Sequence, residues 1–195
     1  RECVESAIGS GMDAEVPGTV HRIESISTTD RHEVDFLTTS LRDVPPRHRS
    51  LRVVFEQSWA HLSAGEQLVF KKLSVFHGGF RRRAASRVAG ATLPVLAALV
   101  DKSLVRRTLA GRYEIQELLR QFAVQKLAAD GRQEHRTRAH HAEFFAAFMD
   151  SQGHAFRGGD EQNALRLIEA EIDNVRAGWR WAARQVATAL IERYL

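Results

Sequence analysis

The hydrophobic pattern of this chain changes its period once, between residues 103 and 116, and this change constrains the fold more than any other feature. The runs "SLVRRT" and "RYEIQ" have the character of short strands, and "LAG" between them supplies a turn, an arrangement that is typical of a β-hairpin. Immediately afterwards, "ELLRQFAVQKL" places apolar residues three and four positions apart, which is the spacing of a helix. We therefore expect a mainly α-helical chain with one β-hairpin.

Helical patterns also precede the hairpin. The first follows a break at Pro45-Pro46 and takes Ser50 as its expected N-cap. The second begins with Ser63 and Glu66, which have the spacing of a capping box. In order, helices are expected at about 50–62, 63–76, 80–89 and 93–102. Helices followed by a hairpin and a further helix form a winged helix, which we predict over residues 44–130.

The remaining segment, residues 131–195, has a helical pattern throughout. One stripe of apolar residues recurs at steps of three and four and predicts an amphipathic helix: Leu165, Ile168, Ile172, Val175 and Trp179. Asp173 and Asn174 are interpreted as part of its hydrated face. With the helix before it and a glycine-containing link at 153–159, this stripe predicts an antiparallel helical hairpin, a unit that normally stacks on further copies.

The N-terminal segment, residues 1–43, is rich in small and polar residues and is expected to be poorly ordered, with a short helix near 33–41. Because the chain does not begin with Met, we expect a piece of a longer protein. No apolar run approaches the roughly 20 residues that cross a bilayer, and no signal peptide is present. With Cys3 as the single cysteine, a reducing, cytoplasmic location is expected, without a membrane partner.

The charge of the chain is distributed unevenly, although the formal net charge is only +4. No Asp or Glu occurs between Gln67 and Val100. The arginines of this stretch and of the hairpin are candidates for contact with nucleic-acid phosphate: Arg81, Arg82, Arg83, Arg87, Arg106, Arg107 and Arg112. An equally open interpretation is that they face solvent or the acidic surface of an adjoining domain.

Specific base recognition is not favoured by the sequence. The helix in the position of a recognition helix, "LPVLAALVDK", has no polar side chain that could contact a base before Asp101 and Lys102. A helix this apolar is expected to be buried on more than one face against a protein neighbour. DNA is therefore a partner in the alternative interpretation only, through its backbone.

No catalytic or metal-binding pattern is present. The motif G-x-x-x-x-G-K-[ST], which holds nucleotide phosphates, does not occur. His135, His140 and His141 lack the spacing that would bring two of them to one metal ion on a helix. We expect no catalytic residue, no metal site and no cofactor in this chain, which is predicted not to be an enzyme.

Five phrases in order, between residues 33 and 185, resemble one family: "SLRDVPPRHRSLRVVFEQSW", "LSVFHGGF", "LVDKSLVRR", "YEIQELLRQFA" and "IEAEIDNVRAGWRWA". The family is that of the bacterial STAND-class, NB-ARC-like signalling ATPases and transcriptional regulators. Residues 1–30 do not share the resemblance. The resemblance implies that residues 131–195 begin a series of tetratricopeptide-like repeats.

The same resemblance implies a regulatory function. The winged helix would couple the nucleotide state of an upstream module, which binds ATP or ADP with Mg²⁺, to helical repeats that receive a protein or small-molecule inducer. Gln116 stands where the family has a nucleotide-sensing histidine. A glutamine amide can donate a hydrogen bond to phosphate, but it carries no charge.

Three functional hypotheses follow from the sequence. The chain is the regulatory module of a STAND-type regulator, with the upstream nucleotide-binding module and further repeats as its partners. The alternative is a winged-helix DNA-binding protein that uses the arginine patch. The third hypothesis, an inactive remnant, follows from the unusual residues 1–30.

Overall fold

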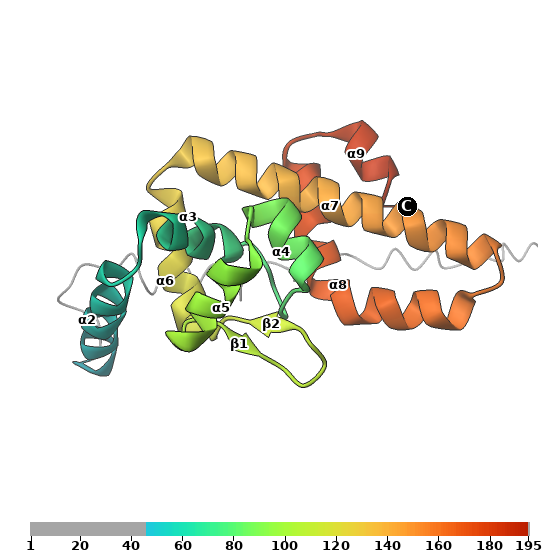
Figure 1. The fold of residues 1–195 in the computed structure, drawn as a ribbon. Coiled ribbons are helices and arrows are strands. Elements are labelled where there is room, and N and C mark those ends of the chain that lie inside the picture. Colours follow the sequence, from blue (N-terminus) through green and yellow to red (C-terminus); the bar gives the residue numbers. More distant parts are fainter. Residues whose placement is uncertain (1–45, 195) are drawn as a thin grey trace, which may run out of the picture. The chain divides into compact units, whose positions relative to one another are not determined.

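The computed structural model describes residues 46–194, and Figure 1 shows how their elements are arranged. In order they are α2 (Pro46–Ala60), α3 (Ala64–Leu73), α4 (Arg82–Ala89), α5 (Leu93–Asp101), β1 (Arg106–Arg107), β2 (Tyr113–Glu114), α6 (Glu117–Ala128), α7 (Gly131–Arg157), α8 (Glu161–Arg184) and α9 (Thr188–Glu192). The predicted mainly α-helical fold with one hairpin and a helical tail is confirmed by this order. The predictions for residues 1–43, including the helix near 33–41, lie outside the described residues.

The first described helix begins earlier than predicted. α2 starts at Pro46, so Ser50 lies inside it and is not its N-cap. Proline is favoured in the first helical turn, because an N–H at that position would have no partner within the helix. The second half of α2 packs on the domain through Trp59, whose ring centroid lies 6.5 Å from that of Phe70 and 6.1 Å from that of Phe122.

The predicted capping box at the start of α3 is confirmed. The Ser63 N–H donates to the Glu66 carboxylate (2.7 Å), and the Glu66 N–H donates to the Ser63 hydroxyl (3.3 Å). Lys102, just after α5, donates to the second oxygen of the same carboxylate at 2.6 Å. The hydrogen bond from Lys102, followed by those from Ser63, lowers the pKa of Glu66 to about 2. One carboxylate thus joins the start of α3 to the end of α5.

Helices α3 to α6 enclose the core of the winged helix. Small residues let α4 pack closely, and Leu96 and Leu99 of α5 are fully buried. The opposite face of α5 is exposed, with Leu93 51% accessible and with Pro94 and Ala97 also exposed. Residues 46–194 thus cover one side of α5 only, and the predicted protein neighbour on its other side stays a prediction.

The predicted hairpin is present, but its strands are short. β1 and β2 pair antiparallel, with Arg107 opposite Tyr113. The "LAG" turn closes with hydrogen bonds between Thr108 and Arg112 and with Gly111 in the left-handed region at φ +73°, where glycine has no steric penalty. A third segment joins this small sheet, because Phe80 forms a bridge with Tyr113 on the side away from β1.

Helices α7 and α8 form the predicted antiparallel hairpin, with two differences. The link lies at 158–160 rather than 153–159, because α7 continues through Gly153 and the left-handed Gly159 provides the turn. The buried face of α8 also lies to one side of the predicted stripe. Leu165 and Trp179 are 56% and 44% exposed, while a stripe of small and polar residues is buried: Ala164, Glu171, Asn174, Gly178 and Ala182.

The winged helix and the helical hairpin share one hydrophobic core. Phe76, which follows α3, lies 6.3 Å from Phe145 and 5.2 Å from His141 of α7 between ring centroids. The predicted boundary near residue 130 falls between α6 and α7, and as a domain boundary it stays a prediction. No single helix of the described residues is long and apolar enough to cross a membrane, and α4 with α5 has the required length and composition only as a pair bent by 106°.

Candidate functional site

The fold brings the predicted arginines of α4 and of the hairpin toward each other. Phe80 and Tyr113 exchange two backbone hydrogen bonds of 2.8 Å, and Tyr113 pairs with Arg107 on its other side. Neighbouring strands lie about 4.8 Å apart, so the backbones at Phe80 and Arg107 are roughly 10 Å apart. The start of α4, immediately after Phe80, therefore lies beside the wing.

The arginines of α4 are on its solvent face. Arg82, Arg83 and Arg87 are exposed, whereas the opposite face of the helix is buried in the core. Arg83 and Arg87 are one turn apart and therefore point to the same side. Arg107 of β1 is also exposed. Among residues 46–194, none of these four arginines forms an ion pair or a hydrogen bond through its side chain.

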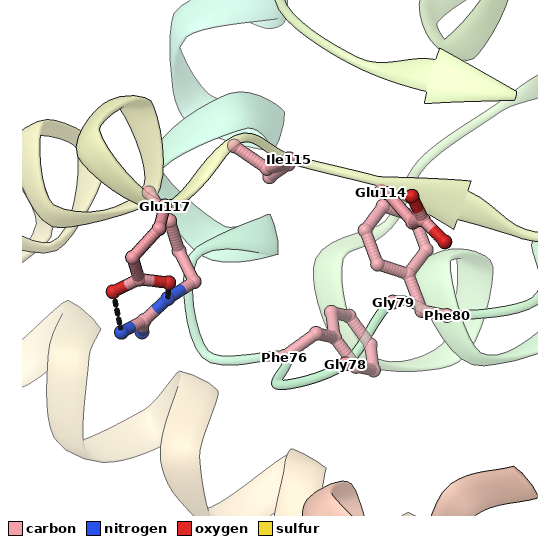
Figure 2. A pocket seen from close by; sticks show the side chains of 8 residues that line it. Phe76, Gly78, Gly79, Phe80, Glu114, Ile115 and Glu117 are labelled. Carbon is pink, nitrogen blue, oxygen red and sulfur yellow. Dashed lines mark hydrogen bonds and ion pairs between the residues drawn. The ribbon is translucent and has the colours of Figure 1, made fainter.

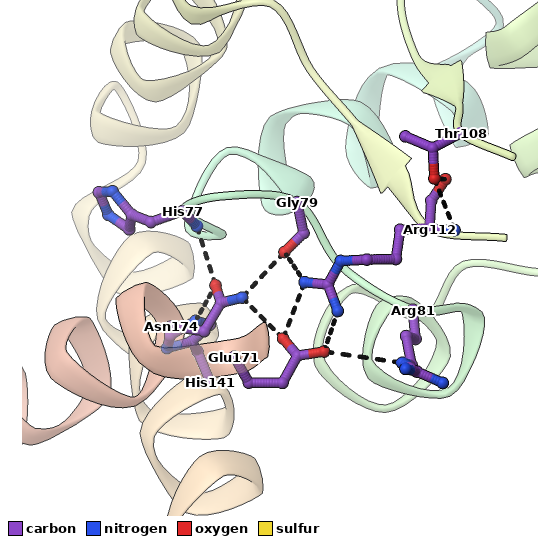
Figure 3. A network of polar contacts seen from close by, with 8 residues as sticks. All are labelled: His77, Gly79, Arg81, Thr108, Arg112, His141, Glu171 and Asn174. Atoms are coloured by element: carbon purple, nitrogen blue, oxygen red, sulfur yellow. Dashed lines mark hydrogen bonds and ion pairs between the residues drawn. The ribbon is translucent and has the colours of Figure 1, made fainter. Parts of the chain in front are cut away.

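Two further arginines of the predicted patch are directed at a carboxylate of the helical hairpin (Figure 3). Arg112 donates through Nη2 to Oε2 of Glu171 at 3.0 Å, and its Nη1 pairs with Oε1. Its side chain is only 13% exposed and that of Glu171 only 10%. Arg81 approaches the same carboxylate, with Nε 3.9 Å from Oε1. Arg106 pairs instead with Glu114 across the hairpin.

Asn174, one turn after Glu171 on α8, completes this network. Its side-chain N–H groups donate to the carbonyl of Gly79 (2.8 Å) and to Glu171 Oε2 (3.1 Å). Its Oδ1 accepts from the backbone N–H of His77 at 2.8 Å. Asn174 is fully buried, so its interpretation as part of a hydrated helix face is wrong. The carboxamide of Asn174 has four hydrogen-bond partners, since Nε2 of His141 on α7 also lies 3.4 Å from Oδ1. These partners take the place of water at the buried side chain.

Sequence reasoning missed the roles of Glu171 and Asn174. The signal that could have found them is the second stripe of α8, in which Ala164, Glu171, Asn174, Gly178 and Ala182 recur at steps of three, four and seven. Small residues in that stripe mark the side on which another backbone approaches closely. Polar residues among them are expected to be buried and hydrogen-bonded.

Gln116, the predicted nucleotide sensor, is the exposed N-cap residue of α6, and its side chain makes no capping hydrogen bond. A pocket beside it is lined by Phe76, Gly78, Gly79, Phe80, Glu114, Ile115, Glu117 and Arg120 (Figure 2). Glu117 accepts two hydrogen bonds from Arg120. Hydrogen bonding to Arg120 is the main cause that lowers the pKa of Glu117. Both carboxylates of this pocket are paired with arginines, Glu114 with Arg106 and Glu117 with Arg120. The role of Gln116 stays a prediction.

Comparisons with known proteins find one group of relatives. No protein-family model and no solved structure matches the chain. The chain is 33% identical over 159 aligned residues to proteins named "Putative HTH-type transcriptional regulator" from mycobacteria: Rv0890c and MT0914 of Mycobacterium tuberculosis and Mb0914c of Mycobacterium bovis. The alignment covers 75% of this chain and 17% of each relative.

This chain is thus similar to a segment of transcriptional regulators, and it spans about a sixth of the length of the curated relatives it matches. The names of these relatives concern transcription and a helix-turn-helix. An upstream ATPase module and the STAND class stay predictions from the sequence resemblance.

Proposed function

We propose that this chain is a segment of a transcriptional regulator and that its winged helix contacts the DNA backbone through Arg82, Arg83, Arg87 and Arg107. The observation that carries this proposal is that these four exposed arginines have no acidic partner among residues 46–194. They belong to two elements that the bridge between Phe80 and Tyr113 holds together. The names of the mycobacterial relatives support a function in transcription. Binding to DNA implies a cytoplasmic location.

The proposed contact is with phosphate rather than with bases. The exposed face of α5 consists of Leu93, Pro94 and Ala97, which have no donor or acceptor for the edge of a base. Arginine side chains that contact only phosphate fix the position of a protein on DNA without selecting a sequence. We therefore expect a non-specific dissociation constant of about 10⁻⁴ to 10⁻⁶ M at physiological salt.

The test is the salt dependence of binding to a labelled 20-base-pair duplex, measured by fluorescence anisotropy with the 195-residue chain. Each phosphate contact contributes about −0.9 to the slope of log K against log salt. The quadruple variant R82A/R83A/R87A/R107A is expected to lose about 3 to 4 units of slope and about tenfold or more in affinity. Duplexes of unrelated sequence should bind equally well.

A matched control separates local contact from net charge. Arg132, Arg136, Arg166 and Arg176 are exposed residues of α7 and α8. Their replacement by alanine lowers the formal net charge from +4 to 0, as the first quadruple variant does. The proposal requires the control to retain most of the slope. Equal losses in the two variants, or no measurable binding by the unmodified chain, would refute it.

A second candidate function is the coupling of nucleotide state to helical repeats, as the STAND-class resemblance implies. The observation that favours it is the apolar exposed face of α5, where Leu93 is 51% accessible and open to a protein neighbour. In this candidate, ATP or ADP with Mg²⁺ binds upstream of the chain, Gln116 contacts the nucleotide, and the repeats receive the inducer. The test is to sequence about 300 codons upstream of Arg1, where absence of a phosphate-binding loop would exclude it.

A further inference from the structure

We propose that Glu171 masks Arg112 and Arg81, so that the helical hairpin competes with DNA phosphate for these two arginines. This inference rests on the proposed function and adds a mode of regulation to it. Any event that moves α8 away from the wing would release two further cations for DNA. Binding of the chain to DNA would then respond to the state of the hairpin.

The first argument is the geometry of the pair. Arg112 directs both terminal nitrogens at the two oxygens of Glu171, the forked arrangement in which arginine also binds a phosphate. Its Nη2 additionally donates to the carbonyl of Gly79 at 3.2 Å. Three of the five N–H groups of the guanidinium, including both on Nη2, are therefore occupied.

The second argument is burial. The side chain of Arg112 is 13% exposed, whereas Arg106 of the same hairpin is 78% exposed. A DNA phosphate could therefore reach the guanidinium of Arg112 only if Glu171 first moved away. Arg81 is the intermediate case, because it approaches Glu171 at 3.9 Å while 57% of its side chain remains exposed.

The third argument is the position of Glu171 in the chain. It lies 59 residues after Arg112, on α8 of the helical hairpin, and Asn174 holds its carboxylate by a hydrogen bond of 3.1 Å. The acidic group that neutralises the wing thus belongs to the part of the molecule outside the winged helix (Figure 3). Because the winged helix and the helical hairpin share one core, release of Arg112 requires a local shift of the Glu171 side chain or of α8, not separation of the two parts.

The test measures duplex binding and its salt slope for Glu171→Gln against a matched control, Glu169→Gln. Both substitutions remove one negative charge from α8, but Glu169 is exposed and the carboxylate at Glu171 is the one that contacts the wing. E171Q is expected to steepen the slope by about 1 to 2 units and to raise affinity about 3- to 10-fold at 100 mM salt. E169Q should change affinity less than twofold.

Two further variants keep the test decisive. Glu171→Asp retains the charge and withdraws the carboxylate by one methylene, so a gain in this variant cannot come from net charge. Arg112→Ala should change affinity less than twofold in the unmodified chain, where Arg112 is masked, but should remove most of the gain in the E171Q background. Circular dichroism melts establish that each variant is folded at the temperature of the assay.

The outcomes separate the two proposals. Binding by the unmodified chain that depends on Arg82, Arg83, Arg87 and Arg107, together with equal behaviour of E171Q and E169Q, overturns the masking and leaves the proposed function intact. Binding that appears only in E171Q supports the masking of Arg112 and Arg81 but refutes the proposed contribution of the four exposed arginines. If neither the unmodified chain nor E171Q binds the duplex, both proposals are wrong.

Discussion

The carboxamide of Asn174 on α8 donates a hydrogen bond of 2.8 Å to the carbonyl of Gly79, 95 residues earlier in the chain. The same carbonyl accepts from Arg112 of the wing. The carbonyl of Gly79, in the loop before α4, thus connects the wing to the helical hairpin. The loop can turn here because Gly78 and Gly79 both have positive φ, at +66° and +87°, a region that other residues rarely enter.

Replacement of Asn174 should destabilise the whole described unit. Asn174→Leu leaves the His77 N–H and one acceptor site of Gly79 without their buried partner, and an unsatisfied buried polar group costs about 1–3 kcal/mol. We expect a decrease of roughly 2–4 kcal/mol in the free energy of unfolding, measured by urea denaturation. Asn163→Ala, on the exposed first turn of α8, is the control and should cost less than about 1 kcal/mol. Similar losses in both variants would show that Asn174 has no special role.

Stability should fall as the pH decreases below the unfolded pKa of histidine, about 6.5. Burial is the main cause that lowers the pKa of His141 to about 3 and that of His77 to about 4. The unfolded chain therefore binds these protons first, and the stability present above pH 6.5 is lost as the pH falls toward 4. For the two histidines together, we expect a loss of roughly 2–4 kcal/mol between pH 7 and pH 5.

The variant that checks this pH dependence is His141→Gln. It removes one of the two titrating groups, so the slope of the free energy of unfolding between pH 6.5 and 5 should decrease by about half. His140→Gln is the matched control, because His140 is the exposed neighbour of the buried His141. Glu66, whose pKa is lowered from 4.5 to about 2, affects the free energy of unfolding only below about pH 4.5, outside this range. An unchanged slope in H141Q would contradict the assignment.

Two glycines that share a positive φ should respond differently to alanine. At Gly111, with φ +73°, an added Cβ would meet no atom within 4 Å, and only backbone strain of about 1–2 kcal/mol is expected. At Gly79, with φ +87°, the Cβ would lie 2.9 Å from the carbonyl oxygen of Tyr113. The Tyr113 carbonyl accepts from the Phe80 N–H, and the Gly79 carbonyl accepts from two side chains. Since these bonds hold both groups in place, G79A should cost at least about 1 kcal/mol more than G111A. Thermal melts of the two variants compare them directly.

Local signals in the sequence were reliable where the interacting residues are neighbours in the chain. Ser63 with Glu66 predicted the start of α3, and Gly111 predicted the turn of the wing. These features depend on backbone geometry over three or four residues, which periodicity and capping rules describe well. The order of helices and hairpin followed from the same rules.

The candidate site could be predicted only in part, because its decisive contacts are long-range. The pattern identified Arg112 as a surface cation, yet its partner Glu171 lies 59 residues away. If one helix is considered alone, a polar residue such as Asn174 is predicted to be exposed to solvent, because most polar residues are. The apolar pattern of α5 did not show which of its faces lies in the core, and the structure leaves Leu93 51% exposed.

The contact between Tyr194, which follows α9, and the helical hairpin provides the last prediction. The Tyr194 hydroxyl donates to the carbonyl of Ala142 at 2.6 Å, and burial raises the pKa of Tyr194 above its usual value. An added Cβ at Gly178 would clash with that hydroxyl and would lie 3.2 Å from the Cα of Ala142. Gly178→Ala should therefore displace Tyr194, with a loss of about 1–3 kcal/mol of stability.

Spectrophotometric titration checks this displacement, because Tyr194 is one of only two tyrosines. In G178A, the pKa of Tyr194 should fall toward 10, since the phenol is then hydrated. Gly153→Ala is the matched control within a helix, because the nearest atom to its added Cβ is Nη1 of Arg157 at 3.8 Å. That variant should be more stable by about 0.5–1 kcal/mol, because alanine loses less backbone entropy than glycine in a helix. An unchanged tyrosine titration in G178A would show that Tyr194 is not held between α7 and α8.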